Sequence, residues 1–284
     1  MTDAPSTNAD QITAWNESTG ATWVKMNPGL DRQLEPIGRE MLARADLGAG
    51  QGVLDIGCGA GATSLSAARA VGPTGRVLGV DISAPLLDLA RSRAAGLTNI
   101  EFLEADAQTL GFEAGAFDRV VSRFGVMFFE DPTAAFANIR RGCRPGAGLS
   151  FACWRGMAEN PWLTLPMEAA KEVVDPLPPP ADPYAPGPAA FADPQRVRDI
   201  LAGAGWREVA VEPLDIEVGG GDLEETTALM TRVGPLGHAL RNAGGGRELI
   251  DAAQDAVRGA VRRFLKADGK AWMPSASWIV TARA

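Results

Sequence analysis

Three alternating glycines directly after an apolar strand constrain this chain more than any other feature. Residues 52–61 are Gly-Val-Leu-Asp-Ile-Gly-Cys-Gly-Ala-Gly, and residues 63–71 have the pattern of a helix. Glycines at a strand-to-helix turn let the backbone approach a ligand closely, and the first turn of the helix offers free N–H groups. The segment therefore predicts a strand, a tight loop and a helix that cradle the polar part of a nucleotide-like ligand.

Short apolar runs alternate with helix-like segments over residues 52–154. The runs that predict strands are Val53–Ile56, Val77–Val80, Ile100–Leu103, Arg119–Ser122 and Leu149–Cys153. Short, continuously apolar runs are typical of parallel strands buried on both faces. Alternation with helices predicts a doubly wound sheet, in which ligands bind beyond the carboxyl ends of the strands. Polar side chains lie at four such ends: Asp55, Asp81, Asp106 and Ser122.

The glycine spacing alone fits two kinds of ligand. Gly57, Gly59 and Ala62 satisfy the loose dinucleotide pattern G-x-G-x-x-G/A. Asp55, two residues before the first glycine, favours a different ligand, because a carboxylate at this strand end would repel a pyrophosphate. The same carboxylate can accept hydrogen bonds from a cationic amino group. The loop therefore favours a ligand with an amino-acid tail over one with two phosphates.

Five motifs, in the same order, resemble those of the class I S-adenosylmethionine-dependent methyltransferases. They are the loop 54–61, Asp81 placed 22 residues after Gly59, the turn Glu104–Ala107, the strand Phe117–Ser122 and the turn Arg144–Gly148. The resemblance covers roughly residues 47–154. It is closest to the ubiquinone/menaquinone C-methyltransferase-like group.

This resemblance implies S-adenosylmethionine as cofactor and S-adenosylhomocysteine as product. It assigns the methionine end of the cofactor to Asp55 and the glycine loop, the ribose to Asp81, and the adenine to Asp106 and Ala107. It also implies that Ser122 lines the methyl-transfer site. The complete set of cofactor-binding residues expected is Trp23, Asp55, Gly57, Cys58, Gly59, Asp81, Ile82, Asp106, Ala107 and Ser122. For Trp23, packing of its helix onto the sheet is an equally good interpretation.

The rest of the chain predicts a mostly parallel, seven-stranded Rossmann-like sheet with N-terminal helices and a helical lid insert. We expect a helical cap over residues 1–46, the cofactor-binding core over 47–155 and the remainder of the sheet over 156–284. Val209–Val218 and Ser277–Ala282 predict strands six and seven, and residues 222–270 predict a lid over the cofactor. Eight prolines between Pro176 and Pro194 predict an extended covering loop.

The charge and composition of the chain count against some classes of binding partner. The 284 residues are 46% hydrophobic and carry a formal net charge of −8, which counts against nucleic acid as a substrate. No stretch reaches the roughly 18 uncharged apolar residues of a membrane span, and the first ten residues contain no basic residue. We therefore expect a cytoplasmic protein without stable membrane association. One histidine and three cysteines without paired spacing predict no metal site.

The acceptor pocket is less defined, and no catalytic residue is assigned. His238, the single histidine, is either a proton acceptor or, as we favour, a surface or packing residue. Arg123 either holds an acidic acceptor or, as we favour, pairs with Glu130 or Asp131. Met127 and Trp154 belong either to an apolar cavity wall or to the core. The candidate substrate-pocket residues are Arg123, Met127, Trp154 and His238.

Residues 122–129, after the fourth strand, contain no Asn- or Asp-Pro-Pro-aromatic run. That run marks methyltransferases acting on nitrogens of bases or of glutamine, so the resemblance implies a small, partly apolar acceptor instead. One alternative is a protein that uses S-adenosylmethionine for another reaction or for sensing. A second alternative is an NAD-dependent oxidoreductase, which would be favoured by a catalytic Tyr-x-x-x-Lys or a His–acid pair, and the sequence has neither.

Overall fold

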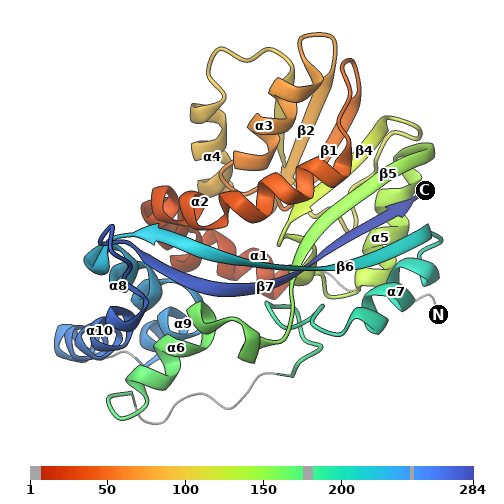
Figure 1. Ribbon diagram of the computed structural model, residues 1–284. Coiled ribbons are helices and arrows are strands. Elements are labelled where there is room, and N and C mark those ends of the chain that lie inside the picture. The colour runs from red at the N-terminus through yellow and green to blue at the C-terminus, as the bar shows by residue number, and fades with distance from the viewer. Residues whose placement is uncertain (1–7, 175–181, 244–245) are drawn as a thin grey trace.

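The computed structural model describes residues 8–174, 182–243 and 246–284, and its centre is a single seven-stranded sheet (Figure 1). The strand order is β3-β2-β1-β4-β5-β7-β6, with β7 antiparallel to both of its neighbours and the other pairs parallel. The strands are β1 (Gly52–Ile56), β2 (Arg76–Asp81), β3 (Ile100–Glu104), β4 (Phe117–Arg123), β5 (Cys143–Trp154), β6 (Arg207–Gly221) and β7 (Ala271–Arg283). The predicted Rossmann-like sheet is confirmed.

β1 is fully buried and pairs with β2 on one side and β4 on the other. Asp55 lies opposite Gly79 of β2 and Val121 of β4. The carboxyl ends of the three strands therefore meet at one edge of the sheet. The residues that follow them, including the glycine loop, are brought together there.

Helices that begin and end where the sequence places caps and breakers cover the sheet. They are α3 (Ala62–Val71), α4 (Ala84–Arg93), α5 (Pro132–Arg141) and α7 (Pro194–Gly203). Asp131 and Asp193 cap the last two by accepting backbone N–H bonds from Ala134 and Gln195. In both helices the capping aspartate is followed by proline at the first helical position, where its missing N–H costs no hydrogen bond.

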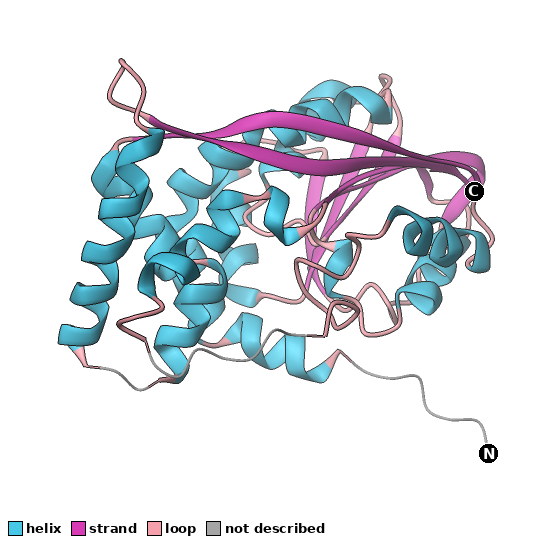
Figure 2. Cartoon of the chain, turned by 60° about the horizontal axis from the view of Figure 1, so that its bottom comes forward, coloured by secondary structure: helices cyan, strands magenta, loops and turns pink. Residues whose placement is uncertain are grey.

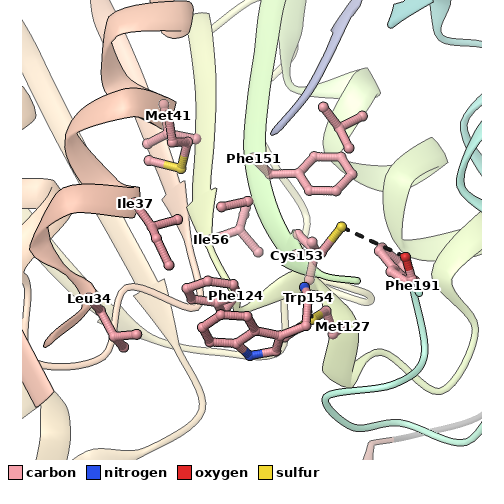
Figure 3. Close-up of a cluster of buried hydrophobic side chains, with 14 of the residues drawn as sticks. Leu34, Ile37, Met41, Ile56, Phe124, Met127, Phe151, Cys153, Trp154 and Phe191 are labelled. Carbon is pink, nitrogen blue, oxygen red and sulfur yellow. Dashed lines mark hydrogen bonds between the residues drawn. The ribbon is translucent and has the colours of Figure 1, made fainter. Parts of the chain in front are cut away.

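The N-terminal helices are α1 (Ala9–Asn16) and the long α2 (Ser18–Ala45), of which α2 lies across the sheet. The buried residues of α2 recur every three or four positions, as on one face of a helix: Leu30, Leu34, Ile37, Met41 and Ala45. This face packs against β4, β5, β6 and β7. Figure 3 shows Leu34, Ile37 and Met41 directed towards Ile56 and the stacked rings of Phe124 and Trp154. The core therefore continues up to the edge where the strand ends meet.

Beyond this edge, three helices of the predicted lid gather with α6 (Pro161–Ala170), as Figure 2 shows beneath one end of the β6–β7 ribbon. They are α8 (Leu223–Arg232), α9 (Gly234–Asn242) and α10 (Arg247–Val261). α10 packs on α8 and α6, and α9 packs on α8 and α6. Among the described residues, we find no helix with the length and apolar character required to span a membrane.

The last strands are longer than the sequence predicted. β6 and β7 continue to pair beyond the end of β5, with Val218 opposite Met273 and Gly219 opposite Trp272. Residues 219–221, expected to end the strand, instead form its last residues with a register shift. β6 and β7 are far apart in the sequence, and their pairing with each other extends both strands beyond their apolar runs. Part of the predicted proline-rich loop, 175–181, falls outside the described residues.

Candidate active site

The glycine loop between β1 and α3 borders a deep cavity. Gly57 and Gly59 have φ values of 63° and 53°, which side chains other than glycine rarely adopt. A Cβ on Gly57 would lie 2.6 Å from Cα of Gly125, whereas a Cβ on Gly59 would meet no atom within 4 Å. Gly57 is thus needed for the close approach of the β1 and β4 ends, and Gly59 leaves open space beside the cavity. The Arg93 guanidinium holds the loop by donating to the Ala60 carbonyl, 2.9 Å away.

Asp81, at the end of β2, lies on the cavity wall beside this loop. Its Oδ2 accepts a hydrogen bond from the Gly59 N–H (2.7 Å) and its Oδ1 accepts one from the Ser83 N–H (2.9 Å). Burial raises the pKa of Asp81, and these two N–H donors act against that rise. Each carboxylate oxygen has further acceptor capacity, so Asp81 can bind hydroxyl groups of a ligand in the cavity.

Asp106, after β3, forms the next part of the wall. Its Oδ1 accepts hydrogen bonds from Asn8 Nδ2 (2.8 Å) and from the Gln108 N–H (2.8 Å). Asn8 also accepts a hydrogen bond from the Glu130 N–H through its Oδ1 (2.8 Å). No sequence pattern marks Asn8, because it precedes α1 and meets Asp106 only through the fold.

Aromatic rings of α1 and α2 close one side of the cavity. Trp15 makes edge-to-face contacts with Trp23 and Phe128, with ring centroids 5.2 and 5.6 Å apart. All three line the cavity, as does Ile82, whose carbonyl accepts a hydrogen bond from the Asn16 side chain (2.7 Å). Trp23 therefore packs on Trp15 of α1 and lies on the cavity wall, and its role in cofactor binding stays a prediction.

A carboxylate that sequence inspection missed, Asp31 of α2, also lies on the wall. It contacts two guanidinium groups, Arg93 at 2.7 Å and Arg123 at 3.3 Å. The favoured ion pair of Arg123 exists, but the expected partners Glu130 and Asp131 were wrong. The reason is that α2 crosses the end of β4 and brings Asp31 to Arg123. Arg123 remains on the cavity wall, with its side chain only 15% exposed.

The far half of the cavity is apolar and aromatic. Phe124, with an unusual φ of 66°, stacks on Trp154 with ring centroids 3.9 Å apart and an interplanar angle of 13°. A non-glycine residue in this conformation is strained, and such residues concentrate at functional sites. The wall in this half consists of Leu30, Leu34, Phe124, Met127, Trp154, Trp162, Leu163, Pro188 and Val233. Met127 and Trp154, predicted for the substrate pocket, thus lie on the cavity wall.

Eight of the ten predicted cofactor residues line the cavity: Trp23, Gly57, Cys58, Gly59, Asp81, Ile82, Asp106 and Ala107. Asp55 does not. It is completely buried, and its Oδ2 accepts hydrogen bonds from the hydroxyls of Thr63 (2.6 Å) and Ser64 (2.5 Å). Burial raises the pKa of Asp55 to about 6. The structure therefore gives this carboxylate a place under the first turn of α3, instead of the expected place on the wall.

Ser122 lies away from the wall, contrary to the sequence-based expectation, and His238 lies away from it too, in agreement with the favoured interpretation as a surface or packing residue. The buried Ser122 hydroxyl donates to the Ile56 carbonyl (2.7 Å) and accepts from the Gly125 N–H (3.2 Å), so it joins the ends of β4 and β1. His238 is exposed on α9. Its position gives no support to a role as proton acceptor in this cavity.

Comparison with known proteins shows which proteins part of this sequence resembles. Residues 53–146 match the family described as "Methyltransferase domain". The chain is 41% identical over 104 residues to the aklanonic acid methyltransferase DauC of Streptomyces sp. strain C5, covering 36% of this chain and 47% of that protein. It is 28% identical over 141 residues to the demethylmenaquinone methyltransferase of Staphylococcus aureus, covering 49% and 58%. The chain thus spans about half the length of the curated relatives it matches.

A solved structure extends the likeness over most of the fold. The YcgJ protein of Bacillus subtilis superposes with a TM-score of 0.54 and 17% identity, covering 88% of this chain and 98% of that protein. At this identity the likeness concerns the fold alone. Residues 53–146 are thus similar to a methyltransferase domain, and they include the glycine loop, Asp81 and Asp106 of the cavity wall.

Proposed function

We propose that this protein transfers the methyl group of S-adenosylmethionine to a small, partly apolar molecule. The observation that carries the proposal is a single cavity with two unlike halves. One half has the glycine loop with Asp81 and Asp106, and the other has the stacked rings of Phe124 and Trp154. Such a cavity accommodates a polar cofactor and an apolar acceptor side by side.

The residues present fit the cofactor. The open space beside Gly59 lets a ligand approach the backbone, and Asp81 next to it would accept hydrogen bonds from two ribose hydroxyls. Asp106, positioned by Asn8, would bind at the adenine end. Asp31, fixed by Arg93 and Arg123, would accept hydrogen bonds from the ammonium of the amino-acid tail, the role that the sequence suggested for Asp55. The bound cofactor would supply a sulfonium methyl group.

The chain's contribution to the reaction is positioning and exclusion of water. Methyl transfer requires the acceptor atom to lie in line with the sulfur–methyl bond at close range. Phe124, Met127 and Trp154 are buried, and they offer the acceptor a dry, rigid surface. No residue of the chain is assigned as a base for the acceptor.

The comparisons support a small organic acceptor. The two named relatives are methyltransferases of aklanonic acid and of demethylmenaquinone. The formal net charge of −8 agrees with an acceptor other than nucleic acid. We therefore propose a small-molecule acceptor, with no nucleic-acid partner and no stable membrane association.

The proposal is tested by titrating S-adenosylhomocysteine into the wild type and Asp81→Ala in a calorimeter. We expect Asp81→Ala to weaken binding at least about tenfold, because it removes charge-assisted hydrogen bonds. Asp88→Ala, which removes an exposed carboxylate paired with Arg91, is the matched control and should bind as the wild type does. Equal affinity of wild type and Asp81→Ala, with both folded by circular dichroism, would refute this assignment of the site.

A further inference from the structure

We propose that Trp154 and Trp162 select the acceptor through a carbonyl-type oxygen, which accepts hydrogen bonds from their indole N–H groups. The inference rests on the proposed function and names the chemical feature that its acceptor must carry. It concerns the apolar half of the cavity, where both tryptophans lie on the wall.

The buried indole N–H groups in this structure differ in whether they have a hydrogen-bond acceptor. Trp206, 3% exposed, donates from Nε1 to the Phe136 carbonyl at 3.0 Å, as buried indoles usually do. Trp154 and Trp162 are 4% and 6% exposed, so they are comparably buried. Within the described residues, neither indole N–H has a hydrogen-bond acceptor, and Nε1 of Trp162 is fully enclosed. Two donors without partners thus lie in one apolar wall.

The two rings are held in place by their surroundings. Trp154 stacks on Phe124, and its ring centroid lies 5.4 Å from that of Trp162. Figure 3 shows the indole nitrogen of Trp154 on the ring edge that faces away from the other side chains drawn. The backbone N–H of Trp154 contacts Sδ of Met127 at 3.4 Å, which fixes the residue further.

Trp162 is positioned by Asn160, the residue that directly precedes α6. The buried Asn160 amide donates to the Ala276 carbonyl (2.9 Å) and accepts from the Ala276 N–H (3.0 Å), as a neighbouring strand would. This contact ties the first turn of α6 to β7. The Trp162 ring, two residues later, is therefore set in advance of ligand binding.

The charges nearby favour a neutral oxygen over an anion. The other residues of the apolar half of the wall, among them Met127, Leu163 and Val233, carry no charge. Among the described residues, the charged groups on the cavity wall are Asp31, Asp81, Asp106 and Arg123, and Arg123 pairs with Asp31. An indole N–H group is a neutral hydrogen-bond donor. In an uncharged wall it therefore suits the carbonyl oxygen of an apolar ring system.

The test uses two probes of similar shape, the ketone 1-tetralone and the hydrocarbon tetralin. Each is added to protein saturated with S-adenosylhomocysteine, and the indole ¹H–¹⁵N signals are followed by NMR. Trp154→Phe and Trp162→Phe, which keep an aromatic ring and remove the N–H, identify the two signals and remove one donor each. Trp278→Phe is the control, because that indole donates to the Ala192 carbonyl outside the cavity wall.

We expect 1-tetralone to move at least one of the two signals downfield and to bind roughly threefold to tenfold more tightly than tetralin, the range of one hydrogen bond. The preference should fall in Trp154→Phe and in Trp162→Phe and be kept in Trp278→Phe. Equal binding of the two probes, no binding of the ketone, or a preference that survives both Phe variants would overturn the inference. Failure of the wild type to bind S-adenosylhomocysteine would instead count against the proposed function.

Discussion

Gly57 and Gly59 lie two residues apart in one loop, yet the structure requires them for different reasons. A Cβ on Gly57 would collide with the backbone of Gly125, whereas a Cβ on Gly59 would enter open space at the cavity. Both residues have positive φ, which costs roughly 1–2 kcal/mol for a residue with a side chain. The same substitution should therefore have two distinct effects.

We predict that Gly59→Ala lowers the free energy of unfolding by only about 1–2 kcal/mol but abolishes measurable binding of S-adenosylhomocysteine. Gly57→Ala should lower the free energy of unfolding considerably more, because the strand ends must separate. Urea unfolding and calorimetric titration distinguish the two effects. Tight cofactor binding by Gly59→Ala would show that the ligand does not approach the loop.

Asp55 makes stability depend on pH through its burial. Its pKa is about 6 in the folded protein against 3.8 in the unfolded chain. Between these values the folded protein keeps a proton that the unfolded chain has lost, so this group lowers the free energy of unfolding as the pH rises. Above both pKa values the penalty is constant, at about 3 kcal/mol.

We therefore predict that Asp55→Asn gains stability relative to the wild type as the pH rises from about 4 to about 7, by up to about 3 kcal/mol. Comparing the two proteins isolates this residue from the other titrating groups. Urea unfolding at both pH values provides the measurement. A difference between the proteins that stays constant with pH would contradict the assigned environment of Asp55.

A site residue could be predicted where the residues next to it in the sequence mark its position. Asp81 and Asp106 follow predicted strands, so their place at the strand ends could be inferred from the sequence alone. Asn8, which precedes α1, and Asp31, on α2, reach the cavity from separate segments, and no local pattern marks them. Asp55 was misplaced because a strand alternates its faces, and the carboxylate meets Thr63 and Ser64 below the loop instead of the ligand space above it.

At the scale of elements, α1 acts as a cover for the cofactor half of the cavity. The Asn16 side chain donates to the Ile82 carbonyl and accepts from the Ala84 N–H, and the Trp15 carbonyl accepts from the Ser83 hydroxyl. These contacts join α1 to the segment directly after Asp81. They lie outside the sheet and its main core, so the helix contributes more to the cavity than to the fold.

We predict that deletion of residues 1–17 leaves a folded protein with a melting temperature near that of the full chain and weaker binding of S-adenosylhomocysteine. The loss of Asn8 and Trp15 removes a polar contact to Asp106 and part of the aromatic wall. Thermal unfolding followed by circular dichroism, together with calorimetry, measures both quantities. Unchanged affinity would show that α1 does not cover the ligand.

Elements were predictable where their own residues determine them. Apolar runs located the seven strands. The ends of β6 and β7 were not predictable, because they are stabilised by pairing with each other rather than by their own apolar residues. The long α2, with Pro28 and Pro36 inside it, likewise depends on packing along the sheet.

At the scale of the whole molecule, one cavity is bordered by the sheet edge, the N-terminal helices, α6 and α9. Its polar half is formed mainly by loops after β1, β2 and β3, and its apolar half by residues from β4, β5, α2 and α6. This division suits the two unlike molecules that the proposed function requires. The proposed acceptor would lie in the apolar half.

The central claim is that this cavity binds an adenosyl cofactor with an amino-acid tail, and calorimetric titration of the wild type with S-adenosylmethionine, S-adenosylhomocysteine and NAD tests it most directly. We predict micromolar or tighter dissociation constants for both adenosyl ligands, on the order of −8 kcal/mol or more favourable, and no measurable binding of NAD. Binding of NAD without binding of either adenosyl ligand would contradict the account.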